Sequence, residues 1–266
     1  MKYKVGFIGC GNMASAIIGG LINNANIKPD EIIASDASEV AVSSAKNTFA
    51  INTTTDNTSV AKESEILFLS VKPQYYEAVI SEIKNILTSN QIVITIAPGK
   101  TLAWLSNLLG DNVKIIRTMP NTPALVGEGI TGVCKNELVS DEEFTYALSL
   151  LSSFGLAEAV PESLMDAVVS VSGSSPAYVF MFIEAMADAA VADGMPRDKA
   201  YKFAAQAVLG SAKMVLETGK HPGELKDMVC SPGGTTIEAV RVLEEKGFRS
   251  SIMEAMKACT SKAKGL

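Results

Sequence analysis

Hydrophobic and polar residues follow a repeating pattern along the first 160 residues of the chain. Short apolar runs recur, and several are apolar almost throughout, as expected of strands buried on both faces of a parallel sheet. The predicted strands span residues 5–9, 31–36, 66–71, 92–97, 113–118 and 130–134. Amphipathic segments between them predict helices over residues 13–23, 37–49, 75–87 and 102–109. This βαβ rhythm predicts an α/β Rossmann fold with a doubly wound, mostly parallel sheet.

The strand signals stop near residue 160, and long helical patterns follow. The predicted helices span residues 163–171, 176–193, 196–218, 222–229, 235–246 and 250–264. Eight of the eleven methionines lie in this part together with many alanines, and both residue types suit packed helices. We therefore expect two domains, a dinucleotide-binding domain over residues 1–160 and an all-α domain over residues 161–266.

One helical segment is apolar on nearly all sides. Residues 177–192 carry only Glu184 and Asp188 as charged residues, one helical turn apart. Such a helix needs neighbours around it, and we expect a second subunit to supply them in an interlocked homodimer. The alternative is the central helix of a monomeric bundle. The segment is shorter than the roughly 20 apolar residues of a membrane span, so a soluble, cytoplasmic protein without a membrane partner is expected.

Composition narrows the classes of partner and chemistry. The formal net charge is −6, and no cluster of Lys or Arg offers a phosphate backbone a local attraction, which argues against a nucleic-acid partner. The four cysteines form no CxxC pair, so no metal site is expected. The single histidine, His221, precedes a proline and is expected to start a helix. A Ser/His/Asp triad would depend wholly on this residue.

A glycine motif follows the first predicted strand. Gly9, Gly11 and Ala14 have the GxGxxA spacing, with a strand before them and a helix after them. The first glycine permits a tight turn, the second lets the backbone approach a pyrophosphate, and Ala14 allows close helix–strand packing. The amides of Asn12 and Met13 open the helix, whose positive end favours the phosphates. The alternative is a tight βα turn without a ligand.

The second strand ends in Ser35 and Asp36, where this fold discriminates between dinucleotides. An acidic residue there accepts hydrogen bonds from the ribose 2′-hydroxyl and favours NADH, whereas the hydroxyls of Ser35 and Ser38 suit the 2′-phosphate of NADPH. No arginine stands beside them, which is an argument for NADH, but both cofactors stay open. The loop Val71–Pro73 follows a strand at the ligand-binding edge, where Lys72 either approaches the cofactor or is solvated.

Two segments of the helical part have the composition of binding loops. Residues 172–178 read SGSSPAY, and residues 231–236 read SPGGTT just before a predicted helix. Two glycines and two threonines at a helix start combine free amides, the positive end of the helix dipole and short hydroxyls, which suits an anion. The alternative for the second segment is a flexible, N-capped turn.

These segments resemble the pyrroline-5-carboxylate reductase family over essentially the whole chain. The matching segments are FIGCGNMASAIIGGL from residue 7, VKPQ at 71–74, MPNTPALVGEG at 119–129, VSGSSPAYVF at 171–180 and HPGELKDMVCSPGGTTIEAVRVLEEKGFR at 221–249. In that family the Rossmann domain binds NADPH or NADH, and the helical domain forms an intertwined homodimer that often assembles into decamers. The resemblance implies hydride transfer to the imine carbon of 1-pyrroline-5-carboxylate, which gives L-proline in the last step of proline biosynthesis.

The resemblance also implies individual roles. The substrate-binding residues it implies are Ser231, Gly233, Gly234, Thr235 and Thr236. The Thr236 hydroxyl is expected to bond the ring nitrogen and is the catalytic candidate. Together with the glycine loop, the expected cofactor-binding residues are Gly9, Gly11, Asn12, Met13, Ala14, Ser35, Asp36, Val71, Lys72, Pro73, Ala97, Met119, Pro120 and Asn121. Two positions depart from the family pattern: Ser175 replaces a glycine, and Pro98 replaces an alanine.

Two other functions fit parts of the sequence. A β-hydroxyacid dehydrogenase shares the two-part architecture, but that family uses a lysine after the Rossmann domain, and residues 172–193 contain none. A dinucleotide-sensing protein without turnover would keep the Rossmann fold but would not need the SPGGTT segment. We therefore expect an NAD(P)H-dependent reductase.

Overall fold

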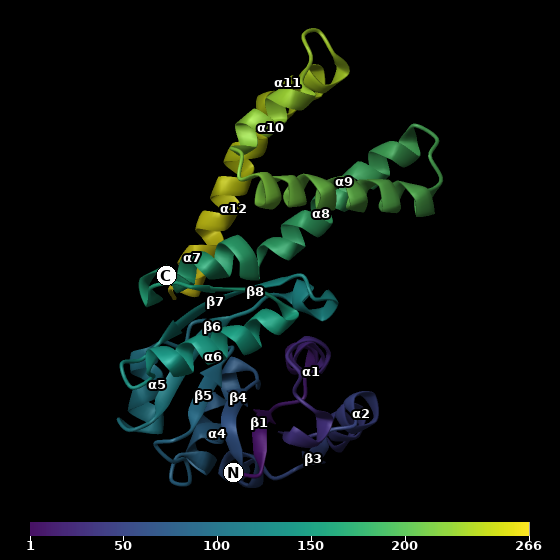
Figure 1. Ribbon diagram of the computed structural model, residues 1–266. Coiled ribbons are helices and arrows are strands. Elements are labelled where there is room, and N and C mark those ends of the chain that lie inside the picture. Colours follow the sequence, from purple (N-terminus) through teal and green to yellow (C-terminus); the bar gives the residue numbers. More distant parts are fainter. Residues whose placement is uncertain (266) are drawn as a thin grey trace. The chain divides into compact units, whose positions relative to one another are not determined.

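The computed structural model describes residues 1–265 and contains one eight-stranded sheet with the order β3-β2-β1-β4-β5-β6-β7-β8 (Figure 1). The strands are β1 (Tyr3–Ile8), β2 (Ile32–Ser35), β3 (Asn52–Thr54), β4 (Ser64–Leu69), β5 (Ile92–Thr95), β6 (Lys114–Met119), β7 (Gly129–Lys135) and β8 (Gly155–Ala159). Neighbouring strands are parallel except β6 and β7. The predicted doubly wound, mostly parallel sheet is confirmed.

Helices cover both faces of this sheet. They are α1 (Asn12–Asn24), α2 (Glu39–Phe49), α3 (Asn57–Glu63), α4 (Tyr76–Ile83), α5 (Leu102–Leu109) and α6 (Asp141–Leu151). Apolar residues of α1, α2 and α6 form one buried cluster on the sheet, and those of α3, α4 and α5 form another. In the first cluster, the rings of Phe7 and Phe68 stack across β1 and β4 with centroids 4.8 Å apart. The near-continuous apolar character of the strands follows from this two-sided burial.

Four elements of this region are additional to those predicted from the pattern: β3, β8, α3 and α6. β3 is only three residues long, and β8 is built mainly from alanine, glycine and glutamate at the edge of the sheet. Neither strand has the long apolar run that marks the others, because β3 is polar and β8 has only one large apolar residue. α6 does carry a start signal, because Ser140 and Glu143 form a reciprocal capping box.

The remaining helices follow the sequence pattern closely. They are α7 (Met165–Val168), α8 (Ser175–Ala192), α9 (Arg197–Thr218), α10 (Pro222–Val229), α11 (Thr235–Glu245) and α12 (Phe248–Ala263). The predicted helix over residues 163–171 is a mixture, in which α7 is preceded by a 3-10 turn and followed by a π-helical segment, Val169–Gly173.

Contacts group the chain into two compact units. The first unit contains residues 1–174 and the segment from Thr260 onward, and the second contains Ser175–Cys259. The returning segment is tied to the first unit by the Thr260 hydroxyl, whose Oγ1 lies 2.9 Å from Ser170 Oγ. The expected division into a dinucleotide-binding domain over residues 1–160 and an all-α domain over residues 161–266 stays a prediction.

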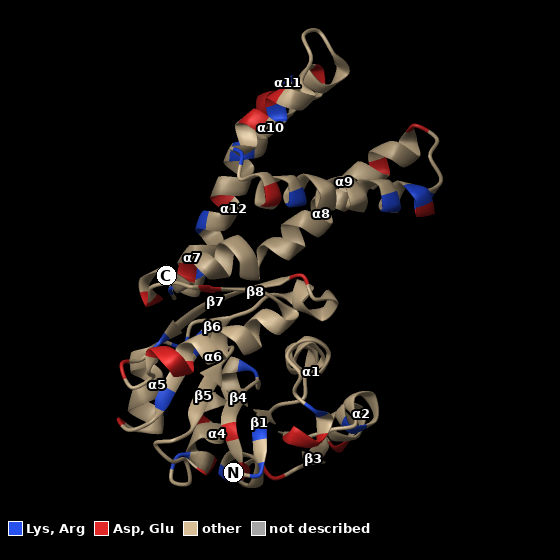
Figure 2. Cartoon of the chain, in the orientation of Figure 1, with Lys and Arg blue, Asp and Glu red and all other residues tan. Residues whose placement is uncertain are grey.

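In the second unit, α8 exposes most of its apolar surface. Only Pro176 and Ala187 of this helix are buried, and Phe180 is 63% exposed. Figure 2 shows that its first half carries no charged residue. The helical segment Glu162–Ala192 contains an 18-residue window with a mean hydropathy of 1.2, which is apolar enough to cross a membrane by length and composition, and 22% of that window is buried. This apolar segment is longer than predicted, because helical structure already begins before Pro176.

Candidate active site

The glycine loop joins β1 to α1 at the carboxyl edge of the sheet. Gly9 has a φ of +105°, and a Cβ at this position would lie 2.7 Å from the carbonyl oxygen of Ser70. The Gly9 amide donates to the Ser35 carbonyl at 2.7 Å. By contrast, a Cβ on Gly11 would meet nothing within 4 Å. The first glycine is therefore required by the turn, and the second leaves open space over the start of α1.

The N-terminus of α1 is free to bind an anion. Gly11 is its N-cap residue, and no side chain caps it. Asn12 and Met13 form the first turn, and Ala14 is fully buried against the sheet. The backbone amides of this turn have no partners within the helix, and the helix dipole adds a positive potential. The loop therefore fits a pyrophosphate.

A pocket of about 620 Å³ lies beside this loop. Its lining residues are Ile8, Gly9, Gly11, Asp36, Ala37, Ser38, Asn57, Ser70, Val71, Lys72, Tyr75, Ala78, Val79 and Glu82. The pocket thus collects the carboxyl ends of β1, β2 and β4, where open α/β sheets bind ligands. The Ser70 hydroxyl on its wall is buried and has no hydrogen-bond partner, which leaves a polar atom for a ligand.

Asp36 is fixed at the edge of this pocket. Its Oδ2 accepts a hydrogen bond from the Cys10 amide at 2.8 Å, and its Oδ1 accepts one from the Ser38 amide at 2.9 Å. Burial, together with the negative charge of Asp36, raises the pKa of the Cys10 thiol to about 12. The cysteine within the glycine motif is therefore a neutral thiol, and its Sγ donates to the Ser35 carbonyl at 3.5 Å.

Ser35 is not brought to the pocket. Its side chain is fully buried, and its hydroxyl lies 2.8 Å from Oδ1 of Asn57. Asn57 in turn donates from Nδ2 to Oε2 of Glu82 at 2.7 Å. Asn57 and Glu82 both line the pocket, yet neither was expected there. They come from α3 and α4, and their proximity follows from the order of the strands, which no local motif reveals.

The other expected cofactor residues lie at the carboxyl ends of further strands. Pro73 opens a 3-10 turn after β4, Ala97 is buried after β5, and Met119 ends β6. After Pro120, which is also buried, the Asn121 side chain donates to the Ser172 carbonyl at 3.1 Å and accepts from the Ile130 amide at 2.9 Å. Asn121 therefore joins this loop to the start of the SGSSPAY segment.

The two departures from the family pattern cause no backbone strain. Ser175 is the first residue of α8, and neither Ser175 nor Pro98 has a positive φ. A Cβ is tolerated at both positions. The added side chains therefore leave the local backbone in an ordinary conformation.

Arg117 is a buried charge that the sequence pattern did not single out. It is 3% exposed, and its guanidinium contacts Glu162 at 2.8 Å and Asp166 at 3.9 Å. Glu162 also accepts a hydrogen bond from the Leu102 amide at 2.6 Å. This network ties β6 to α5 and α7, close to the loop that starts at Met119.

The SPGGTT segment forms a tight turn at the start of α11. The Gly234 amide donates to the Ser231 carbonyl at 3.0 Å, and Gly233 has a φ of +67°. A Cβ on Gly234 would lie 2.4 Å from the Ser231 hydroxyl, so the turn holds this hydroxyl against the helix start. Gly234 is the N-cap residue of α11, and no side chain caps the helix.

This turn brings the predicted substrate residues together. Thr235 and Thr236 form the first turn of α11, where Thr236 is half-buried and Thr235 is exposed. The free amides, the helix dipole and the Ser231 hydroxyl together suit a carboxylate. The Thr236 hydroxyl adds a group that can donate or accept one further hydrogen bond.

His221 has the structural role that its position predicted. Its Nδ1 accepts a hydrogen bond from the Gly223 amide at 3.1 Å and so caps α10. Residues 1–265 contain no group of three or more His, Cys, Asp and Glu side chains that could hold a metal ion.

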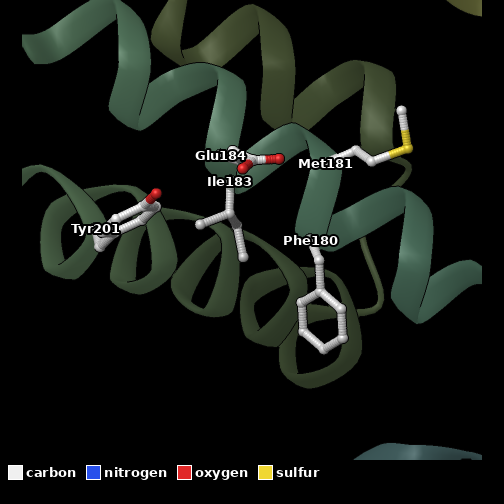
Figure 3. Close-up of a pocket in the computed structure, with 5 residues that line it drawn as sticks. All are labelled: Phe180, Met181, Ile183, Glu184 and Tyr201. Atoms are coloured by element: carbon white, nitrogen blue, oxygen red, sulfur yellow. The ribbon is translucent and has the colours of Figure 1, made fainter.

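A separate pocket of about 360 Å³ lies between α8 and α9. It is lined by Phe180, Met181, Ile183, Glu184 and Tyr201. Figure 3 shows that Phe180 and Ile183 extend from α8 on the side where Tyr201 lies, whereas Met181 points away. None of these residues was a predicted site residue, and the pocket belongs to the apolar surface of α8 that the chain leaves exposed.

Comparison with known proteins places the chain in a family. Residues 162–266 match the model of pyrroline-5-carboxylate reductase dimerisation, and residues 4–99 match that of NADP oxidoreductase coenzyme F420-dependent. The pyrroline-5-carboxylate reductase of Escherichia coli (strain K12) is 56% identical over 266 residues, which cover 100% of this chain and 99% of the relative. That of Methanosarcina acetivorans is 46% identical and covers 99% of this chain and 97% of the relative.

Solved structures agree with this assignment. A pyrroline-5-carboxylate reductase from Coxiella burnetii superimposes with a TM-score of 0.91 at 36% identity, covering 100% of this chain and 98% of that one. A Plasmodium falciparum pyrroline carboxylate reductase with NADP bound gives a TM-score of 0.90 at 34% identity, with 100% and 98% covered. With these relatives matched along its whole length, the chain belongs to the pyrroline-5-carboxylate reductase family.

Proposed function

We propose that this protein reduces 1-pyrroline-5-carboxylate to L-proline with NADPH or NADH, the last step of proline biosynthesis. The observation that carries the proposal is the uncapped start of α11, where the Ser231 hydroxyl lies against the N-cap residue Gly234 and Thr236 belongs to the first turn. This arrangement suits an anion. A carboxylate next to a ring nitrogen is the substrate that this arrangement fits. Family membership and the dinucleotide pocket of the first unit supply the rest of the argument.

The first unit provides the cofactor site. The turn at Gly9, the open space over Gly11 and the amides of the residues from Asn12 to Ala14 would hold the pyrophosphate. Asp36 would accept a hydrogen bond from the adenosine ribose. The residues assigned to the remainder of the cofactor are Val71, Lys72, Pro73, Ala97, Met119, Pro120 and Asn121. Ser35 would contribute only through its carbonyl, which holds Gly9, because its side chain is buried.

The SPGGTT turn provides the substrate site. The Ser231 hydroxyl and the backbone from Gly233 to Thr236 would bind the carboxylate, and the Thr236 hydroxyl would orient the ring nitrogen. The nicotinamide cofactor supplies the hydride when bound. If the imine binds in its protonated form, the carbon is electrophilic enough to need no general acid from the protein. A threonine hydroxyl can donate or accept, so Thr236 serves either protonation state.

The apolar surface of α8 supports a homodimer. Few of its residues are buried in the chain, and a second copy would cover them. We assign residues 1–160 to cofactor binding and residues 161–266 to dimerisation and substrate binding. The proposal also includes further assembly to a decamer and a cytoplasmic location. It includes neither a membrane nor a nucleic-acid partner.

The test is the loss of reduced-nicotinamide absorbance when the purified protein meets 1-pyrroline-5-carboxylate, with NADPH and NADH compared side by side. We expect turnover and a proline product. A reaction without the imine is the blank, and a β-hydroxyacid with the oxidised cofactor is the control for dehydrogenase activity. Dinucleotide binding without imine reduction would contradict the proposal.

A further inference from the structure

We propose that this pocket is selective for NADH over NADPH, and that two carboxylates, Asp36 and Glu82, set this preference. The inference rests on the proposed use of a nicotinamide dinucleotide and names which of the two cofactors is preferred. The two molecules differ only by the 2′-phosphate on the adenosine ribose. Discrimination must therefore arise where the pocket meets that ribose, at the end of β2.

Asp36 is oriented to bind a hydroxyl at this place. Each of its carboxylate oxygens accepts one backbone hydrogen bond, from Cys10 and from Ser38, and retains a lone pair for a further donor. A ribose 2′-hydroxyl is such a donor. A 2′-phosphate brings up to two negative charges and no such donor when ionised, so it meets electrostatic repulsion.

Glu82 places a second carboxylate on the wall of the same pocket. The amide nitrogen of Asn57 holds it at 2.7 Å, and the amide oxygen of Asn57 faces the buried Ser35 hydroxyl at 2.8 Å. Because a carboxylate only accepts, this contact fixes which end of the Asn57 amide faces Glu82. One of the two Asn57 amide protons is thereby engaged and no longer offered to a phosphate. The same hydrogen bond holds the negative charge of Glu82 at the pocket wall.

The groups that could compensate a 2′-phosphate are few. Lys72 is the only Lys or Arg among the residues that line the pocket, against two carboxylates. The Ser35 hydroxyl is buried, and the Ser38 hydroxyl accepts the Ala41 amide at the start of α2 at 3.4 Å. The lining residues thus carry a net charge of −1, counted as one lysine against Asp36 and Glu82. This balance favours the cofactor with fewer negative charges.

The test measures the Kd of NADH and of NADPH by titration calorimetry with the full-length protein and no imine. We expect NADH to bind at least about tenfold more tightly. Glu82→Gln removes the charge but keeps an acceptor for Asn57, and it should improve NADPH binding several-fold and NADH binding less. Asp36→Asn should reduce the ratio of the NADPH Kd to the NADH Kd further. Glu77→Gln, an exposed position of α4 that does not line the pocket, is the matched control and should change neither Kd.

Two further measurements distinguish an electrostatic effect of the carboxylates from a structural effect of the substitutions. The preference for NADH should shrink as salt is raised in the native protein, but not in a variant that lacks both carboxylates. Ala37→Arg adds a cation at the pocket wall and should strengthen NADPH binding. This substitution tests the electrostatic argument even if Asp36→Asn disturbs the loop.

The outcomes separate this inference from the proposed function. Equal or tighter NADPH binding by the native protein overturns the inference, as does a Glu82→Gln variant that changes both Kd values alike. NADH-selective binding without imine reduction would uphold the selectivity and contradict the reductase. A protein that binds neither dinucleotide would contradict both.

Discussion

The two units of this chain use apolar residues in different ways. In the first unit, the strands and the helices that cover them form two clusters that are almost completely buried within one chain. In the second unit, the only buried residues of α8 and α9 are Pro176, Ala187, Ala200 and Ala204. No residue of α10 or α11 is buried. The first unit closes its own core, whereas the second leaves large apolar residues exposed on the surface of the single chain.

Ion pairs show the same contrast among the described residues. In the first unit, Lys114 pairs with Glu143, 29 positions away, and Arg117 pairs with Glu162, 45 positions away. The pairs of the second unit join residues close in sequence, such as Arg241 and Glu245 on one helix. Long-range pairs stabilise tertiary structure, whereas local pairs stabilise individual helices. The second unit of this chain is therefore held together by fewer long-range ion pairs than the first.

The largest effect is expected from a charge on the exposed face of α8. Phe180→Asp should abolish the dimer, because an interface that covers this position would bury an unpaired carboxylate at a cost of several kcal/mol. Size-exclusion chromatography with light scattering measures the result. Val40→Asp on α2 is the control, since Val40 is 80% exposed in the first unit and should leave the oligomeric state unchanged. A dimeric Phe180→Asp variant would contradict the comparison.

A pair of phenylalanine truncations compares the two units directly. Phe7→Ala should lower the free energy of unfolding by about 3–5 kcal/mol, because it removes a stacked ring from a closed core. Phe203 of α9 is 67% exposed in the chain, yet Phe203→Ala should cost more than about 2 kcal/mol if a second subunit covers it. Urea unfolding at one fixed protomer concentration measures both. A loss below about 0.5 kcal/mol for Phe203→Ala would show that this position faces solvent.

Thr236 offers a test that concerns the reaction and not the stability. Thr236→Ala should lower kcat/KM by the equivalent of about 1–3 kcal/mol, the contribution of one buried hydrogen bond to the bound substrate. Thermal unfolding should be little changed, since Thr236 lies in the first turn of α11 and makes no core contact. Thr236→Ser should restore most of the activity, and Thr235→Ala is a neighbouring control. Unchanged kinetics would remove the Thr236 hydroxyl from the site.

The smallest effect is expected from the ion pairs and depends on pH. The Lys114 ammonium and the Ser140 amide lower the pKa of Glu143, in that order of importance. Because the folded-state pKa lies below that of the unfolded chain, the stabilisation is present above about pH 4.3 and is lost as the pH falls through the folded-state pKa. Glu143→Gln should therefore cost up to about 1 kcal/mol at neutral pH.

Chemical denaturation between neutral and acidic pH checks this expectation. The difference between the native protein and Glu143→Gln should close in acid. Glu245→Gln on α11 removes a local, exposed pair and should cost less than about 0.5 kcal/mol at any pH. Equal losses from the two variants would contradict the contrast between long-range and local pairs.

The fold could be predicted from the sequence wherever a buried face gives the hydrophobic residues a regular spacing along the chain. α5 and α10 begin and end at the predicted residues, and the strands of the sheet centre are displaced by a few residues at most. β3 and β8 were missed because edge strands are short and half exposed, so they carry little apolar signal. The capping box at Ser140 and Glu143 would have revealed α6.

The candidate site likewise contains residues that the sequence indicated and residues that it did not. Local motifs indicated the glycine loop and the SPGGTT turn, because a turn and the helix after it are adjacent in sequence. Asn57 and Glu82 could not be found in this way, since they reach the pocket through the side-by-side arrangement of β1, β2 and β4. Ser35 was expected to serve the cofactor through its hydroxyl. One residue of difference along a strand reverses the direction of a side chain, and Ser35 faces Asn57 instead.

The return of the chain from the second unit to the first has a consequence for biosynthesis. The first unit includes the segment from Thr260, where the Thr260 hydroxyl contacts Ser170, 90 positions earlier. The ribosome therefore synthesises all of the second unit before it synthesises the last segment of the first unit. Domains usually fold in the order in which they emerge, but here the first cannot be completed until the second has been made. A premature stop after residue 259 would leave the first unit without the contact between Thr260 and Ser170.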